Sequence, residues 1–226
     1  MGPAADFELR NEFGNTEANL RFLERVGRLA PGMRILEIGS GRGALLRHLA
    51  RQGHSIEGVE VNPDRIEESR RLYGPLPLTR VEGTRLPFPD ASFDVVLSFD
   101  VFEHIRDSDG HLREVRRVLV PGGRYLLQTP NKWTNTVFET IRWRSFTSWR
   151  DDHCALHSFR QLRRRLRRHG FRVTFADIPV VTDFFRRKLR HYLGPPAPLM
   201  LWLANPDRLP LALRTNFYVE ATKDGR

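Results

Sequence analysis

Apolar residues occur along this chain in two kinds of pattern, short runs and runs with helical spacing. The short runs have the length of buried strands and lie at residues 34–38, 55–60, 93–99 and 124–129. Between them, apolar residues three and four positions apart predict amphipathic helices over 16–30, 43–51 and 111–119. Pro121-Gly-Gly123 is expected to stop the last of these helices. This alternation predicts a parallel sheet with helices on both faces and right-handed crossovers.

Polar residues mark where further elements begin and end. Asn62 and Pro63 predict a helix start, because Asn caps the first turn and Pro fits its first position. Ser158 and Gln161 form a capping-box pattern at the start of an arginine-rich helix, which ends at Gly170. Three more strands are predicted at 78–81, 171–175 and 216–222.

Two long segments fall outside this scheme. Residues 131–157 are rich in tryptophan and phenylalanine, and residues 177–214 contain several prolines and an apolar run at 199–203. Segments of this length inside a compact domain are usually functional. At 226 residues, the chain is expected to form a single domain that carries both segments as insertions.

A glycine-rich turn follows the first predicted strand. Gly39, Gly41 and Gly43 let the chain turn sharply into a helix whose N-terminus points at a bound molecule. Glycine-rich turns also occur for purely structural reasons, so the next strand matters. It ends at Glu60, where a carboxylate can accept hydrogen bonds from both hydroxyls of a ribose. The two features predict an adenosine-type cofactor; an exposed strand-end acid is the alternative for Glu60.

Longer stretches of the chain resemble class I S-adenosylmethionine-dependent methyltransferases of the broad small-molecule type. The matching stretches keep the family's order: Ile35-Leu-Glu-Ile-Gly-Ser-Gly-Arg-Gly43, Gly58-Val-Glu-Val-Asn62, Val81-Glu-Gly-Thr-Arg-Leu-Pro-Phe-Pro-Asp90, Ser92-Phe-Asp-Val-Val-Leu97, Val101-Phe-Glu-His-Ile105 and Leu119-Val-Pro-Gly-Gly-Arg124. A dehydrogenase shares only the first two. The resemblance implies an α/β, Rossmann-like sheet of seven mostly parallel strands with an antiparallel last strand. It also implies that S-adenosyl-L-methionine is the cofactor and that the insertions at 131–157 and 177–214 form a cap that binds the methyl acceptor.

The resemblance also assigns roles around the cofactor. Glu37 orients the glycine-rich turn and the methionine end, and Glu60 holds the ribose. Glu82 stands where the family usually has aspartate; either acid can accept a hydrogen bond from the adenine amino group. The cofactor residues that the resemblance implies are Glu37, Gly39, Gly41, Gly43, Glu60, Val61, Asn62, Glu82, Gly83, Phe99 and Asp100.

Two histidines are candidate general bases. A sulfonium is a strongly activated methyl donor, so alignment of the nucleophile supplies much of the rate, and a histidine can assist a hydroxyl acceptor. His104 follows the fourth strand, close to the expected position of the methyl group. Its alternative role, together with Glu103, is to brace the strand–helix junction. His153 lies in the first insertion, where a loop could cover the acceptor.

The composition limits metal and redox chemistry. The single Cys154 excludes an internal disulfide framework and a thiolate zinc cage, so we expect a reducing, cytoplasmic compartment. Asp151, Asp152 and His153 are adjacent loop residues with weak ligand geometry, and we predict no metal site.

The net charge of +10 comes mainly from arginine. Arg163–Arg168 and Arg186–Arg190 concentrate charge near the C-terminus; they predict either solvated helix faces or contact with an anionic substrate, nucleic acid or membrane. Phe184, Phe185 and the 199–203 run could form an amphipathic patch at a membrane surface. The alternative is a lid packed on the domain.

Three functions follow from these observations. We expect a methyltransferase acting at a hydroxyl oxygen of a small or medium-sized, partly apolar or lipid-like acceptor. The alternatives are a methyltransferase for RNA or another nucleic acid, disfavoured because no RNA-binding module is recognisable, and a non-catalytic protein on a cofactor fold. The oligomeric state stays open.

Overall fold

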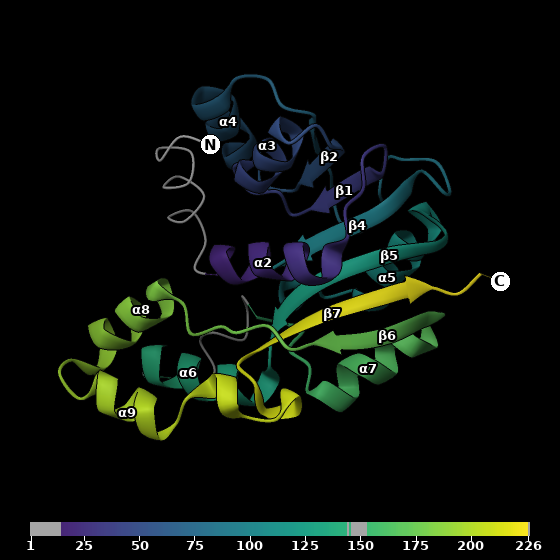
Figure 1. Ribbon diagram of the computed structural model, residues 1–226. Coiled ribbons are helices and arrows are strands. Elements are labelled where there is room, and N and C mark those ends of the chain that lie inside the picture. Colours follow the sequence, from purple (N-terminus) through teal and green to yellow (C-terminus); the bar gives the residue numbers. More distant parts are fainter. Residues whose placement is uncertain (1–14, 144, 146–152, 226) are drawn as a thin grey trace.

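The computed structural model describes residues 15–143, 145 and 153–225 around a seven-stranded sheet of order β3-β2-β1-β4-β5-β7-β6 (Figure 1). β7 runs antiparallel to both of its neighbours, and the other pairings are parallel. The predicted seven-stranded sheet with its antiparallel last strand is therefore confirmed. The strands are β1 (Arg34–Ile38), β2 (Ser55–Glu60), β3 (Leu78–Arg80), β4 (Phe93–Phe99), β5 (Leu119–Pro130), β6 (Phe171–Ala176) and β7 (Asn216–Lys223).

Helices and short helical turns connect these strands. The α-helices are α2 (Thr16–Phe22), α3 (Ala44–Arg51), α4 (Pro63–Tyr73), α5 (Ser108–Val118), α6 (Lys132–Trp143), α7 (Phe159–Arg168), α8 (Asp183–Leu193) and α9 (Ala197–Leu203). The shorter turns are the π-helical η1 (Leu23–Gly27) and the 3₁₀-helical η2 (Phe102–His104), η3 (Pro206–Arg208) and η4 (Leu211–Leu213). No helix among these residues combines the length and the apolarity that crossing a bilayer requires.

Side chains alternate across the strands, so both faces of the sheet carry an apolar core. Ile35 of β1 joins a cluster with residues of α2 and α3, whereas its neighbour Leu36 joins a cluster with residues of α5 and α7. Both side chains are fully buried. Because helices cover both faces, the parallel strands are apolar on both sides, which explains their continuous apolar runs in the sequence.

The predicted helix caps are confirmed. The side chain of Asn62 accepts a hydrogen bond from the Asp64 N–H at 2.9 Å, with Pro63 in the first helical position. Ser158 and Gln161 form both bonds of the capping box at the start of α7. These caps satisfy backbone N–H groups that would otherwise lack partners at the helix ends.

Several predicted boundaries were wrong, including the start of α5 at Ser108 instead of residue 111. The helix expected over 16–30 ends as the η1 turn, and Arg28 follows in a left-handed conformation (φ 44°). The guanidinium of Arg124, in β5, donates hydrogen bonds to the carbonyls of Val26 and Arg28 at 3.3 and 3.2 Å. These bonds give partners to carbonyl groups that the end of a helix leaves free. β5 begins at Leu119, before the Pro121-Gly-Gly123 stretch that was expected to separate helix from strand, because that stretch bulges out of the β4–β5 ladder.

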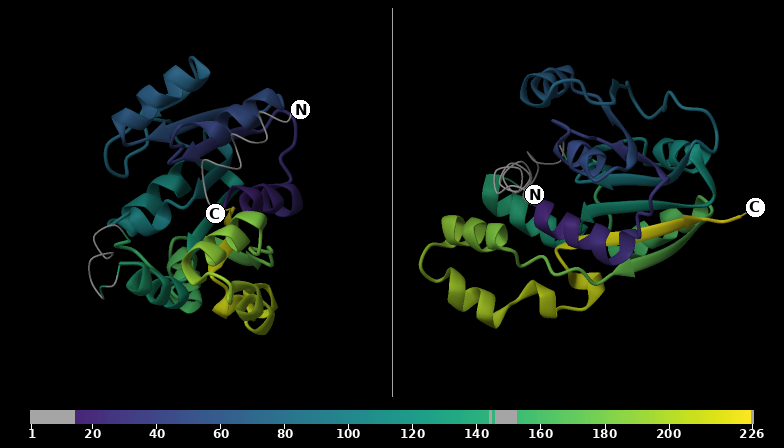
Figure 2. Two further views of the ribbon diagram at one scale, coloured as in Figure 1. Left: turned by 90° about the vertical axis from the view of Figure 1, so that its left-hand side faces the viewer. Right: turned by 45° about the horizontal axis from the view of Figure 1, so that its top comes forward.

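The insertions contain helices. Segment 131–157 contributes α6, and segment 177–214 contributes α8, α9, η3 and η4; residues 144 and 146–152, with the predicted Asp151 and Asp152, lie outside the described part of the chain. Figures 1 and 2 show α6, α8 and α9 beyond the carboxyl ends of β4 and β5. Asn131 is fully buried and joins the two insertions, since its side-chain amide donates to the carbonyls of Ala212 and Arg214 at 3.1 and 2.8 Å.

Two buried histidines make this fold sensitive to acid. Burial lowers the pKa of His111 to about 4, and its Nε2 lies 3.0 Å from the Tyr125 hydroxyl. Burial and the nearby Arg165 guanidinium lower the pKa of His157 to about 4. Both values lie below the ordinary value of about 6.5 for an unfolded chain, so the unfolded state binds more protons between these pH values.

We therefore expect the two neutral histidines to make their full contribution to the free energy of unfolding above about pH 6.5. This contribution should be lost as the pH drops toward about 4. The loss attributable to His111 is roughly 3 kcal/mol. Urea unfolding at stepped pH, followed by circular dichroism, measures this slope. His111→Gln keeps a polar partner for Tyr125 and should flatten the slope; a variant with the wild-type slope would contradict the assignment.

Candidate functional site

The glycine-rich turn sits at the carboxyl end of β1, in the first crossover of the sheet. Gly39, Gly41 and Gly43 all have positive φ angles, of 71°, 56° and 82°, which side-chain-bearing residues rarely adopt. The N–H of Gly39 donates to the carbonyl of Val59 at 2.8 Å, so the turn is tied to β2. A Cβ placed on Gly39 would lie 2.3 Å from Cγ2 of Val101, which packs against the turn from the segment after β4.

Glu60 anchors the same turn from the end of β2. Its side chain is buried, and its carboxylate accepts hydrogen bonds from the N–H groups of Gly41 at 2.8 Å and of Val61 and Asn62 at 2.9 Å. The alternative of an exposed strand-end acid is therefore wrong. A carboxylate has about four acceptor positions, so one remains for a ribose hydroxyl; a second hydroxyl would have to replace a backbone N–H.

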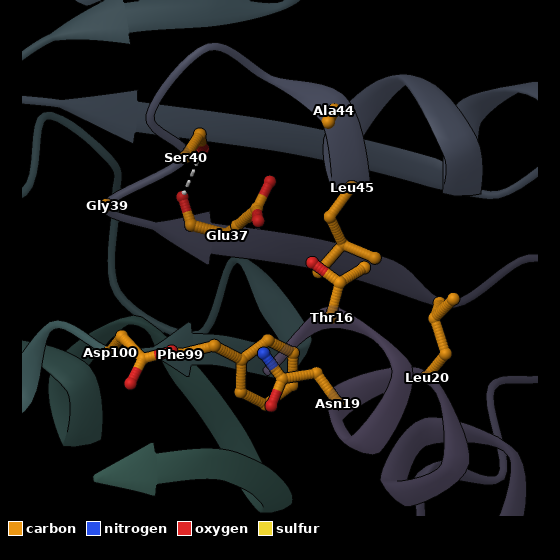
Figure 3. Close-up of a pocket in the computed structure, with 10 residues that line it drawn as sticks. All are labelled: Thr16, Asn19, Leu20, Glu37, Gly39, Ser40, Ala44, Leu45, Phe99 and Asp100. Carbon is orange, nitrogen blue, oxygen red and sulfur yellow. Dashed lines mark hydrogen bonds between the residues drawn. The ribbon is translucent and has the colours of Figure 1, made fainter. Parts of the chain in front are cut away.

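A pocket lies between the turn, α2 and the end of β4 (Figure 3). It brings together the predicted residues Glu37, Gly39, Phe99 and Asp100. Two of them are acids, which suits a cationic amino group or sulfonium, and apolar side chains complete the wall. The residues that line the pocket are Thr16, Asn19, Leu20, Glu37, Gly39, Ser40, Ala44, Leu45, Phe99 and Asp100.

Asp100 has a strained backbone (φ 53°), and a closed ring of hydrogen bonds holds it. Its N–H donates to Oε1 of Gln128 at 2.8 Å, and its carboxylate accepts from Nδ2 of Asn15 at 3.0 Å. Asn216 closes the ring, because it accepts from Gln128 at 3.2 Å and donates to Asn15 at 3.5 Å. Strain of this kind persists where the surrounding structure enforces it, typically at functional sites.

The remaining predicted cofactor residues lie outside this pocket, near the carboxyl ends of β2 and β3. Val61 is 57% exposed, and Asn62 caps α4. The side chain of Glu82 is 85% exposed and pairs with Arg80 at 3.4 Å. Gly83 has a positive φ of 65° and has open space where a Cβ would lie. Their roles toward adenine stay predictions.

The structure brings the two candidate bases together. The rings of His104, in η2, and His153 lie 5.0 Å apart in an edge-to-face arrangement. Asn135 of α6 places its amide 2.8 Å from Nδ1 of His153. Glu103 is buried, accepts from the Thr129 hydroxyl at 3.0 Å, and its carbonyl accepts from the N–H of Ala155 at 2.8 Å. Glu103 therefore braces the junction, whereas His104 is exposed.

No group of three or more His, Cys, Asp or Glu side chains in the described part of the chain is placed to hold a metal ion. Of the three residues considered for a metal site, Asp151, Asp152 and His153, only His153 lies in the described part of the chain. The absence of a metal stays a prediction.

Sequence reasoning missed the contribution of α2. Thr16 and Asn19 are buried, although both are polar, and they lie three positions apart on the face that packs on the sheet. It also missed Gln128, a fully buried polar residue within the apolar run of β5. In both places a polar residue interrupts an apolar pattern, and that interruption was the available signal.

Residues 11–175 match the family of methyltransferase domains. The chain belongs to this family. Among curated relatives, a fatty-acid O-methyltransferase of Mycolicibacterium smegmatis is 39% identical over 99 residues, which are 42% of this chain and 36% of the relative. A ubiquinone/menaquinone biosynthesis C-methyltransferase of Bordetella avium is 32% identical over 169 residues, or 68% of this chain and 65% of the relative. The chain thus spans less than two thirds of the length of these relatives.

Among solved structures, a chain in the complex between the Haloferax volcanii Trm112 methyltransferase activator and a methyltransferase has a TM-score of 0.71 to this protein. It is 18% identical, and the match covers 98% of this chain and 95% of that one. The predicted Rossmann-like fold is confirmed. The family model and the fold together identify this part of the chain as a class I methyltransferase domain.

We expect Gly39→Ala to destabilise this methyltransferase more than Gly53→Ala. Both glycines have positive φ, so both substitutions add backbone strain of about 1–2 kcal/mol. Only Gly39 lacks room for a Cβ, which adds about 1–3 kcal/mol of overpacking. Urea denaturation measures the difference; equal losses for the two variants would contradict the close packing of Val101 on the turn.

We expect Glu60→Ala to weaken S-adenosyl-L-methionine binding about 100-fold or more, because it removes the ribose acceptor and leaves three backbone N–H groups without their carboxylate. Isothermal titration calorimetry with S-adenosylhomocysteine and S-adenosyl-L-methionine measures the loss. Glu57→Ala, an exposed acid on the same strand, is the matched control and should bind like the wild type. An unchanged dissociation constant in Glu60→Ala would remove Glu60 from the site.

Proposed function

We propose that this methyltransferase transfers a methyl group to a hydroxyl oxygen of a small or medium-sized, partly apolar acceptor. The paired rings of His104 and His153, 5.0 Å apart, carry the proposal. A hydroxyl is a weak nucleophile until its proton is removed, and histidine is the side chain best suited to remove it near neutral pH.

The residues around the pocket fit S-adenosyl-L-methionine. Glu37 and Asp100 would hold its cationic methionine end, and Glu60 would accept a ribose hydroxyl. The adenine would lie against four further residues, as the resemblance implies: Val61, Asn62, Glu82 and Gly83. When bound, the cofactor supplies a methyl carbon made electrophilic by a positively charged sulfur.

The chain acts in this proposal as one domain, 1–226, whose insertions at 131–157 and 177–214 form a cap over the acceptor. Two observations support the cap. Helices α6, α8 and α9 lie beyond the carboxyl ends of the strands, where open α/β folds bind their ligands (Figure 1). In addition, Asn131 joins the two insertions through its bonds to the carbonyls of Ala212 and Arg214.

The histidine pair would work by positioning and proton transfer. Asn135 fixes the ring of His153, and His153 in turn limits how the ring of His104 can rotate. During methyl transfer, a ring nitrogen of His104 would accept the proton that the acceptor hydroxyl releases. Holding the acceptor in line at about 3 Å contributes more than the base, because the methyl group is already activated.

Methylation of carbon is a second candidate. It is favoured by the longer of the two alignments, to the C-methyltransferase of Bordetella avium, which covers 68% of this chain. The fatty-acid O-methyltransferase favours oxygen, at higher identity over a shorter stretch. An activated ring carbon, such as one beside a phenolic oxygen, also needs proton removal, so the same histidines would serve either reaction.

The nature of the methylated atom decides between them. We would incubate the protein with ¹³C-methyl-labelled S-adenosyl-L-methionine and panels of phenols, quinone precursors and fatty acids, and identify products by carbon NMR. A methyl signal in the range of methoxy or ester groups supports the proposal. A signal in the range of carbon-bound methyl groups establishes the second candidate, and methylation of RNA alone would overturn both.

We expect His104→Ala to lower turnover about 100-fold, because general-base assistance is lost, while the dissociation constant of the cofactor stays within about twofold. His54→Ala is the matched control, since His54 precedes β2 at the opposite end of the sheet. Steady-state kinetics with an acceptor identified in the labelling experiment measures turnover, and calorimetry measures the dissociation constant of the cofactor. Normal turnover in His104→Ala would exclude it from the reaction.

A further inference from the structure

Helix α9 is apolar on two sides, and only one side is covered. Ala197 and Leu201 are buried, at 2% and 8% exposure, and pack against the rest of the domain. The alternative prediction, a lid packed on the domain, concerns this inner side and stays a prediction. Four large apolar side chains point outward with exposures of 60%, 47%, 69% and 68%: Leu199, Met200, Trp202 and Leu203.

A soluble surface rarely gathers so many large apolar side chains on one turn of helix. Elsewhere among the described residues, such side chains are exposed singly or in pairs, as with Leu72 on α4. Burying Trp202 and Leu203 in an apolar medium would remove both from water, which is the favourable term in membrane and protein association.

The neighbouring helix α8 adds positive charge. α8 and α9 pack against each other as a hairpin. Arg186, Arg187 and Arg190 are exposed on one stripe of α8, and no acidic side chain among the described residues pairs with them. Phe184 and Phe185, which were predicted to belong to the same patch, are half-buried.

We propose that the α8–α9 hairpin docks this protein on the surface of an anionic phospholipid bilayer. The exposed apolar turn of α9 would enter the acyl boundary, with Trp202 at the headgroup level, where tryptophan is favoured. The arginines of α8 would contact lipid phosphates; each basic residue near an anionic surface contributes attraction that falls within a Debye length. The combination of an apolar turn and exposed arginines matches an anionic bilayer better than an apolar protein surface.

The hairpin lies on the same side of the sheet as the carboxyl strand ends (Figures 1 and 2). Docking there would bring the acceptor side of the site to the lipid surface. This consequence rests on the proposed function and suits an acceptor dissolved in the bilayer. The docking itself is independent of which acceptor the enzyme uses.

Flotation with vesicles tests the docking without any enzymatic readout. We would compare vesicles of phosphatidylcholine alone with equimolar phosphatidylcholine and phosphatidylglycerol. We expect the protein to float with the anionic vesicles and to be released by salt. Trp202→Asp combined with Leu203→Asp should lower the partition coefficient about tenfold or more. Arg186→Glu combined with Arg190→Glu should remove the preference for anionic vesicles.

Leu72→Asp is the matched control, because Leu72 is 57% exposed on α4, on the far side of the molecule (Figure 1). It should float like the wild type. Each variant must keep wild-type cofactor binding by calorimetry, which separates a failed site from failed docking. Wild-type protein that stays in solution, or a Trp202/Leu203 variant that floats normally, would overturn the proposal. The proposal would also be overturned if light scattering showed that the wild type is a dimer and that the same two substitutions dissociate it. A second copy of the chain would then cover the exposed side of α9.

Discussion

The buried carboxylate of Glu60 holds the framework of the candidate cofactor site together. It accepts N–H groups from the glycine-rich turn after β1 and from the segment after β2, so one side chain fixes two neighbouring crossovers. The positive φ angles of the turn point its amide toward this acid. A charged group buried to this degree is stable only with such partners. The same carboxylate therefore serves the fold and leaves a remaining acceptor position for the cofactor.

A second hydrogen-bond network holds Asp100 in the pocket at the end of β4, as Glu60 holds the glycine-rich turn. Asp100 is strained at the end of β4, and Asn15, Gln128 and Asn216 enclose it in a ring that reaches α2, β5 and β7. Asn216 is the first residue of β7, and Thr215 alone separates it from the second insertion. The position of Asp100 in the pocket is thereby linked to the start of β7. Few elements of the site can shift without disturbing this ring.

The two insertions combine two kinds of surface. Polar contacts, such as those of Asn131, tie the insertions to each other, and α8 and α9 carry exposed leucines, a tryptophan and arginines. These polar contacts do not involve the exposed side chains of α9, so those side chains can differ in chemistry without altering the contacts.

The sequence alone determined the strands, the glycine-rich turn and the helix caps, because each depends on neighbours within a few residues. Strand length, apolar period and the pairs Asn62–Asp64 and Ser158–Gln161 are local properties of this kind. Only the tertiary structure placed His104 beside His153, because they lie on segments that meet through the contact of Glu103 with Ala155. The early start of β5 also depended on a partner strand. Leu201 turned inward while Trp202 turned outward, although both belong to one apolar run, because burial there was decided by what the rest of the chain packs against.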